Sequence, residues 1–115
     1  MKQKNNQSVD YSIVIPVYQN EGSLEDTFKL IKEKVIDINS QYSAEVIFID
    51  DGSTDSSFQT LMRLHEAHPE LIVIIKLTRN FGTYPAIIAG YEKARGKCVV
   101  CNKKANNVVY IARDY

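Results

Sequence analysis

Four short apolar segments, separated by three amphipathic helical patterns, most constrain what this chain can fold into. The segments are rich in β-branched residues, which is typical of strands buried on both faces of a sheet. They span residues 11–18, 44–50, 71–77 and 97–101. Strands that alternate with helices predict an α/β fold, a Rossmann-like three-layer structure with a parallel sheet and helices on both faces.

The helical patterns lie between residues 23 and 38, 54 and 68, and 85 and 96. The first is the clearest, because its apolar side chains recur every three or four residues as one stripe. That stripe comprises Leu24, Phe28, Ile31, Val35 and Ile38. Pro85 is predicted in the first turn of the third helix, where its missing N–H is harmless.

Polar residues follow the carboxyl ends of the first three strands. These segments are Pro16–Glu21, Asp50–Ser53 and Thr78–Gly82. Ligands of open parallel sheets bind at this edge, so the sequence predicts a ligand site there. The sequence contains neither G-x-G-x-x-G nor G-x-x-x-x-G-K-[ST], so a nucleotide would have to be held in another way.

Asp50 and Asp51 directly follow an apolar strand, where an unpaired carboxylate is costly to bury. Ionised carboxylates accept hydrogen bonds and suit the N–H of a nucleobase and the hydroxyls of a ribose. Arg79 offers a planar fork for phosphate, and Lys76 lies near the end of the same strand. The alternative is structural: Asp51 begins a turn, Asp55 caps a helix, and the cations are solvated.

The composition is that of one small globular domain, with 115 residues of which 44% are hydrophobic and 24% charged. No apolar run approaches the roughly 20 residues that span a bilayer, and the polar start lacks the apolar part of a signal peptide. A cytoplasmic location is therefore expected. Charge is uneven: residues 1–75 carry 6 Lys/Arg and 12 Asp/Glu, whereas residues 76–115 carry 8 and 2. This is either chance on solvated faces or a basic side suited to phosphates.

Other residue types that carry chemistry give no predicted site. His65 and His68 have no partners at metal-ligand spacing, so a structural role is expected. Cys98 and Cys101 lie in a predicted strand, whose alternation points them to opposite faces and makes them structural thiols. The tyrosines form no stacking row, so no nucleic-acid partner is expected.

Three motifs together resemble a known family. They are SIVIPVYQNEGSL from Ser12, EVIFIDDGSTDSS from Glu45 and LTRNFGTYPAIIAGYEKARG from Leu77. They are similar to the amino-terminal half of the inverting family 2 glycosyltransferases, near the dolichol- and undecaprenyl-phosphate sugar transferases. The resemblance covers residues 11–101. It implies a GT-A fold, the sheet order 3-2-1-4, and transfer of a sugar from a nucleotide-sugar to a lipid phosphate or a glycan.

The resemblance also implies roles around the nucleoside. Pro16, Val17 and Tyr18 would line the pocket that holds it. Glu21 would match the acid of the family's tyrosine-asparagine-glutamate segment. Ile49 would contact the base or ribose from the end of the second strand.

Further roles follow for the polar residues. Asp51 would contact the base and ribose, with Asp50 beside it. Arg79 would reach towards the diphosphate from the same strand end as Lys76, and Gly82 would let the backbone turn close by. No catalytic residue and no metal ligand is assigned in this chain.

The sequence departs from the family pattern after residue 101. The intact family has an Asp-x-Asp motif there, which holds Mg²⁺ or Mn²⁺, but the aligned positions are Lys103 and Ala105. We therefore expect no cofactor in this chain. The expected organisation is a disordered arm over 1–10, a partial GT-A-like nucleotide-binding domain over 11–101 and a divergent tail over 102–115. It corresponds to a truncated fragment without the acceptor-binding half.

Two functions are consistent with the sequence. The first is a family 2 glycosyltransferase, or its amino-terminal part, that uses a UDP- or GDP-linked sugar. The second is a non-catalytic nucleotide-binding or interaction module derived from such an enzyme. In a fragment the strand at 97–101 would be a bare apolar edge, which predicts self-association.

Overall fold

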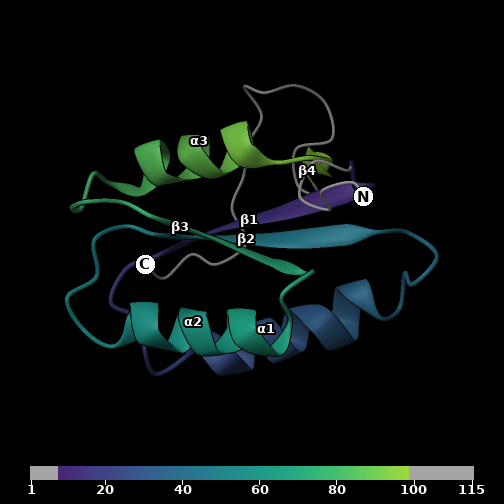
Figure 1. The fold of residues 1–115 in the computed structure, drawn as a ribbon, viewed down its shortest axis with the longest axis horizontal. Helices are drawn as coiled ribbons and strands as arrows, with labels where there is room; N and C mark the ends of the chain where they lie inside the picture. The colour runs from purple at the N-terminus through teal and green to yellow at the C-terminus, as the bar shows by residue number, and fades with distance from the viewer. Residues whose placement is uncertain (1–7, 99–115) are drawn as a thin grey trace.

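The computed structural model describes residues 8–98 and confirms the predicted fold class. A parallel sheet in the order β3-β2-β1-β4 is covered by α1 and α2 on one face and α3 on the other (Figure 1). The elements are β1 (Tyr11–Val17), α1 (Leu24–Ile31), the π-helical turn η2 (Lys32–Ile36), β2 (Ala44–Asp50), α2 (Ser57–Ala67), β3 (Ile72–Lys76), α3 (Thr83–Lys93) and β4 (Lys97–Cys98).

The register brings the ends of β1, β2 and β3 level at one edge of the sheet, called here the carboxyl edge. Val17 pairs with Asp50, and Asp50 in turn pairs with Lys76. The loops that follow these strands therefore start side by side. This is the edge at which the sequence predicts a ligand site.

The core has two parts, one on each side of the sheet. Alternate residues of the strands, such as Ile13 and Phe48, pack with Phe28 and Leu61 of α1 and α2. The residues between them, such as Ile47, pack on the α3 side. Because both faces are covered, the strands are mostly apolar on both faces, which is why their extents could be predicted.

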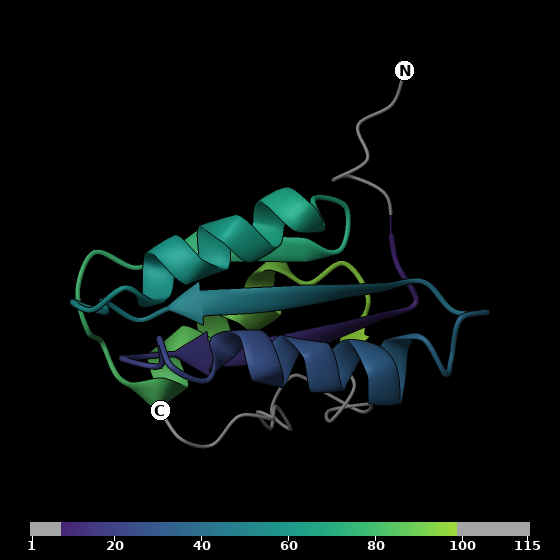
Figure 2. The same ribbon diagram turned by 90° about the horizontal axis from the view of Figure 1, so that it is seen from below.

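The predicted helical stripe is wrong at Ile38, which is 66% exposed. The physical reason is η2, where Asp37 N–H donates to Lys32 O at 2.8 Å across a wider turn than that of an α-helix. The extra residue in this turn brings Ile36 against the core in place of Ile38, beside Val35, which packs there as predicted. Figure 2 shows this helical segment beside α2, with β2 visible between them.

A buried ion pair at the opposite edge of the sheet holds the connection between α3 and β4. The carboxylate of Glu45, 1% exposed, accepts hydrogen bonds from Ser12 Oγ at 2.6 Å, Arg95 N at 2.6 Å and Arg95 Nε at 2.8 Å. Gly96 N–H donates to Ser12 Oγ at 3.0 Å, and a Cβ at position 96 would meet Val9 O at 2.5 Å. Nothing in the sequence pattern predicted this anchor.

The predicted domain boundaries stay predictions, because residues 1–7 and 99–115 lie outside the described residues. Asp10, at the end of the predicted arm, exchanges hydrogen bonds with Ser43: its N–H donates to Ser43 O at 3.0 Å, and its carboxylate accepts from Ser43 N at 2.8 Å. Among residues 8–98, no helix is long and apolar enough to cross a membrane.

Candidate functional site at the carboxyl edge

Asp51 holds the loop after β3 in place. Its side chain is 0% exposed, and its carboxylate accepts hydrogen bonds from Phe81 N at 2.7 Å, Gly82 N at 3.0 Å and Asn80 Nδ2 at 3.2 Å. Two of these donors are backbone groups at the start of α3, where the helix dipole favours a negative charge. The buried acid is thus paired with the loop that carries Arg79.

Gly52 lets the two loops approach to backbone contact. Its φ angle is +77°, in the left-handed region, and a Cβ at this position would lie 2.4 Å from Arg79 C and Asn80 N. Both observations require glycine here. The D-D-G-S segment therefore forms a turn and also packs, at Gly52, directly against the backbone of the loop after β3.

Asp50 points to the other face of the sheet, towards α2, and is also 0% exposed. Its Oδ1 accepts a hydrogen bond from Ser53 N at 3.2 Å. Its Oδ2 has no hydrogen-bond partner among the described residues, although Lys76 Nζ lies 3.9 Å away. That distance is an ion pair but too long for a hydrogen bond. The Lys76 ammonium also lies 4.7 Å from the ring centroid of Phe58.

The loop after β1 is bound to the loop after β2 through Gln19, which sequence reasoning did not single out. Gln19 has a φ of 56°, and its Oε1 accepts hydrogen bonds from Thr54 N at 2.7 Å and Asp55 N at 3.3 Å. Its own N–H donates to Ser53 Oγ at 3.0 Å. The facing runs Q-N-E and S-T-D-S-S, both rich in hydrogen-bonding groups, were the available signal.

Glu21, predicted to match a nucleoside-binding acid, accepts a hydrogen bond from Ser56 N at 2.5 Å before α2. Asp55 accepts from Ser57 N at 2.9 Å and Glu21 N at 3.4 Å. Burial alone raises the pKa of the Asp55 carboxyl, but hydrogen bonds from Ser57 and the Glu21 backbone outweigh it and leave that pKa below its ordinary value. Both acids therefore stabilise the start of α2.

The other predicted contacts divide into a buried and an exposed set. Pro16, Val17 and Ile49 are buried at the ends of their strands, so they lie beneath the loops of the carboxyl edge. Tyr18 is half-buried, and Arg79 is exposed. The half-buried Gly82, with a φ of +107°, is the residue immediately before α3.

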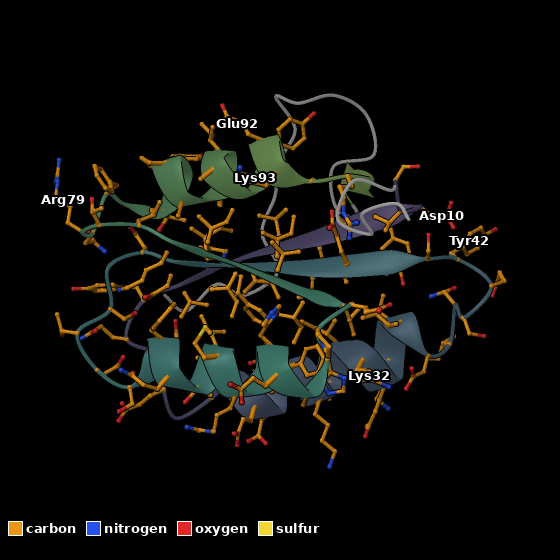
Figure 3. All side chains as sticks on the ribbon, in the orientation of Figure 1. Asp10, Lys32, Tyr42, Arg79, Glu92 and Lys93 are labelled. Carbon is orange, nitrogen blue, oxygen red and sulfur yellow. The ribbon has the colours of Figure 1, made fainter. Side chains whose placement is uncertain are left out.

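Arg79 projects beyond the sheet at the carboxyl edge, where Figure 3 labels it. Its guanidinium carbon lies 4.1 Å from the ring centroid of Phe81. The stacking restricts the side chain but leaves the guanidinium donors able to bind an anion. Lys76, with 53% of its side chain exposed, adds a second cation at the same edge.

A metal site does not form from the described part of the chain. Among residues 8–98, no group of three or more His, Cys, Asp or Glu side chains could hold a metal ion. Lys103 and Ala105, the positions aligned with the Asp-x-Asp motif, lie outside the described residues, and neither side chain is a metal ligand at neutral pH. The residues that the structure describes therefore do not fit Mg²⁺ or Mn²⁺.

A separate cavity of ≈ 370 Å³ lies between α1 and α2, over Phe28, Leu64 and His68. Several of the charged side chains that line it form ion pairs within the protein. Lys32 Nζ lies 3.2 Å from Asp37 Oδ1, and Glu25 Oε2 lies 3.5 Å from Arg63 Nη2. Nothing in its lining indicates a particular ligand.

The sheet order, the two helical layers and the three loops at one edge define an α/β domain of the GT-A glycosyltransferase class. A solved mannosyltransferase from Pyrobaculum calidifontis, in complex with GDP-Man and Mn²⁺, superimposes with a TM-score of 0.64 at 22% identity, over 78% of this chain and 26% of that one. This likeness shows the fold.

The family follows from the sequence comparison. The model of glycosyl transferase family 2 matches residues 12–102, and the chain belongs to that family. An undecaprenyl-phosphate 4-deoxy-4-formamido-L-arabinose transferase of Pseudomonas aeruginosa is 35% identical over 89 residues, 77% of this chain. The uncharacterized glycosyltransferase YkcC of Bacillus subtilis is 37% identical over 92 residues, 80% of this chain. The chain spans about a quarter of these relatives, 26% and 28% of their lengths.

Proposed function

We propose that this chain binds the nucleotide part of a nucleotide-sugar at the carboxyl edge, as the donor-binding part of a family 2 glycosyltransferase. The observation that carries the proposal is the way Asp51 and Gly52 lock the loop after β3, which sets the backbone of Arg79 against the loop after β2. A cation stacked on an aromatic ring next to polar loops suits a nucleoside diphosphate.

The proposed roles differ from those that the sequence suggested for the acids. Asp51 and Glu21 position loops, through Phe81 N and Ser56 N, and reach a ligand indirectly. Arg79 binds the diphosphate and Lys76 adds charge at its side. Tyr18 lines the nucleoside pocket above the buried floor. The donor is UDP- or GDP-linked, and lipid phosphate or glycan is the acceptor class, by analogy with relatives named undecaprenyl-phosphate transferases.

Sugar transfer itself is proposed for a protein that carries the remaining parts of the relatives. A second candidate function, a non-catalytic nucleotide-binding module, is favoured by the lysine at position 103, where the family has a metal-binding acid. Transfer of a radiolabelled sugar by the purified chain supports the first function. Nucleotide binding without transfer supports the second. In either case, we place the activity on the cytoplasmic side of the membrane, where nucleotide-sugars are made.

Self-association through the strand at 97–101 stays a proposal. Within the described residues, β4 pairs with β1 over two residue pairs, and an unpaired strand edge can bind another chain. Sedimentation velocity tests it: concentration-dependent dimers support the proposal, and a monomer at every concentration contradicts it.

The direct test is calorimetric titration with UDP and GDP, with and without Mn²⁺. We expect weak binding that Mn²⁺ tightens by less than about tenfold, because no metal bridges the protein to the diphosphate. Arg79→Gln should weaken diphosphate binding by about tenfold or more while leaving nucleoside binding unchanged. Arg63→Gln, on the exposed surface of α2, is the matched control and should have no effect. Equal behaviour of the two variants contradicts the proposed site.

A further inference from the structure

The strand β3 ends the sheet on one side, and no further strand pairs with it among residues 8–98 (Figure 1). Its hydrogen bonds show which backbone groups point away from β2. Leu71 O and Leu77 N both bond to β2, at 2.8 and 2.9 Å, so the odd-numbered residues of this stretch face β2. The residues whose backbone N–H and C=O point outward are Ile72, Ile74 and Lys76.

The protein itself satisfies only the first part of this outward edge. Ile72 N donates to His68 O at 3.1 Å, and Ile72 O accepts from His65 Nδ1 at 2.9 Å. The outward N–H and C=O groups of Ile74 and Lys76 have no hydrogen-bond partner among the described residues. Such an unpaired strand edge can bind another strand.

On the α2 face of the sheet, an exposed apolar side chain lies beside this edge. The ring of Phe58 lies 4.7 Å from the Lys76 ammonium at the end of β3, and His65 bonds to the start of the strand. The helical period places Met62 between Phe58 and His65 on the same side of α2, next to the middle of β3. Met62 is 37% exposed, so an approaching strand would bury it.

The other face of β3 is incompletely covered. The helix α3 packs mainly on β1 and β2. Val73 and Ile75 point to the α3 face and are only half-buried. The open edge therefore has apolar side chains on both faces of the sheet, which favours burial against another chain.

Antiparallel pairing with β3 of a second copy would satisfy all of the unpaired groups together. With Ile75 on the two-fold axis, Ile74 of each copy lies opposite Lys76 of the other. Each of these pairs exchanges its N–H and C=O groups, which gives about four hydrogen bonds in total. The contact is self-complementary and closes as a dimer.

The charges around β3 favour this antiparallel direction. Two exposed acids, Glu66 and Glu70, precede the strand, and two exposed cations, Lys76 and Arg79, lie at its end and beyond it. Antiparallel pairing brings the acidic start of one strand beside the basic end of the other. The Lys76 charge at the edge is also offset within its own subunit, because Asp50 Oδ2 lies 3.9 Å from its Nζ.

We propose that two copies of this chain associate through their β3 strands, as an antiparallel pair centred on Ile75, to form one continuous sheet. This contact lies on the opposite side of the sheet from β4, and is thus distinct from pairing through the strand at 97–101. It is made by β3 and the adjacent side of α2 and does not depend on nucleotide binding.

Sedimentation velocity of the full chain tests for the dimer. We expect a weak and reversible dimer, because the paired strand is short, and added salt should weaken it further. Met62→Lys should weaken the dimer by about tenfold or more, since it places like charges on both sides of the axis. Leu30→Lys, at a 56% exposed position on α1, is the matched control and should change the affinity by less than about twofold.

Oxidative cross-linking tests the register. Ile75→Cys would place two thiols in a non-hydrogen-bonded pair with Cα atoms about 4.5 Å apart, within reach of a disulfide. Val73→Cys is the matched control on the same face of β3, because it would lie about 13 Å along the strand from its counterpart. We expect Ile75→Cys to cross-link at least about tenfold faster. Mass spectrometry of the linked peptides separates these bridges from any through Cys98 or Cys101.

Several results would overturn the proposal. A monomer at every concentration, equal effects of the two lysine variants, or equal cross-linking at positions 73 and 75 would each do so. A dimer that does not cross-link through Ile75→Cys would be assigned to another surface, such as the strand at 97–101. Circular dichroism confirms that each variant is folded, and the lysine variants, both at exposed positions, decide the question if a cysteine variant unfolds.

Discussion

The neighbouring acids Asp51 and Asp50 should respond very differently to the same substitution. Asp51→Asn replaces a carboxylate that accepts from Phe81 N, Gly82 N and Asn80 Nδ2 at 2.7, 3.0 and 3.2 Å. The amide keeps one oxygen and turns an NH₂ group towards a donor, so at least one buried N–H loses its acceptor. A lost bond to a charged group and a stranded donor together cost about 3–5 kcal/mol of the free energy of unfolding.

Asp50→Asn should change the free energy of unfolding by less than about 1 kcal/mol. The amide oxygen can still accept from Ser53 N, and Oδ2 has no hydrogen bond to lose within residues 8–98. The lost ion pair joins a lysine whose side chain is 53% exposed, and removal of a buried charge offsets it.

Urea unfolding followed by far-ultraviolet circular dichroism measures both variants under the same conditions. The reasoning predicts that Asp51→Asn is the less stable of the two by at least about 2 kcal/mol. Equal losses, or a larger loss for Asp50→Asn, would refute the assignment of Asp51 as the residue that holds the loop after β3.

Three further predictions concern the same framework. Gly52→Ala should lower the free energy of unfolding by more than about 2 kcal/mol, because its Cβ would meet backbone at 2.4 Å. Gly22→Ala should be near neutral, since none of the described atoms lies within 4 Å of a Cβ there, and urea unfolding compares the two variants. Asp55→Asn should destabilise at pH 7. Because the folded-state pKa of Asp55 is depressed, that loss should shrink as the pH falls below about 4, measured by thermal unfolding across pH, and a constant loss would contradict it. Glu45→Gln should cost about 3 kcal/mol by stranding Arg95, and a double variant with Arg95→Met should recover part of it; simple additivity would argue against the buried pair.

The strands and their order could be predicted because both faces of the sheet are covered. Residues 44–50 form a largely apolar run, which is typical of a strand buried on both faces, and they are β2 in the structure. The turn at η2 could not be predicted, since apolar spacing alone does not distinguish an α-helical from a π-helical turn. Its effect was to move Ile38 outward.

The sequence predicted that polar loops would lie together at one edge of the sheet, but not the contacts between these loops. Asp51 accepts from Phe81, 30 residues away, and Gln19 accepts from Thr54, 35 residues away. Such pairs depend on how two loops are positioned relative to each other in the folded protein, and the sequence of either loop alone does not specify this. Glu45 and Arg95 are separated by 50 residues and gave no local signal.

The central claim is that a nucleotide binds at the carboxyl edge, and NMR mapping of bound UDP or GDP tests it most directly. Titration of isotope-labelled protein should shift the backbone amides of Tyr18, Ser53, Arg79 and Gly82, which lie in the three loops at that edge. Amides at the opposite edge, such as that of Arg95, should be unchanged. Largest shifts around Arg95, or in the cavity between α1 and α2, would contradict the account.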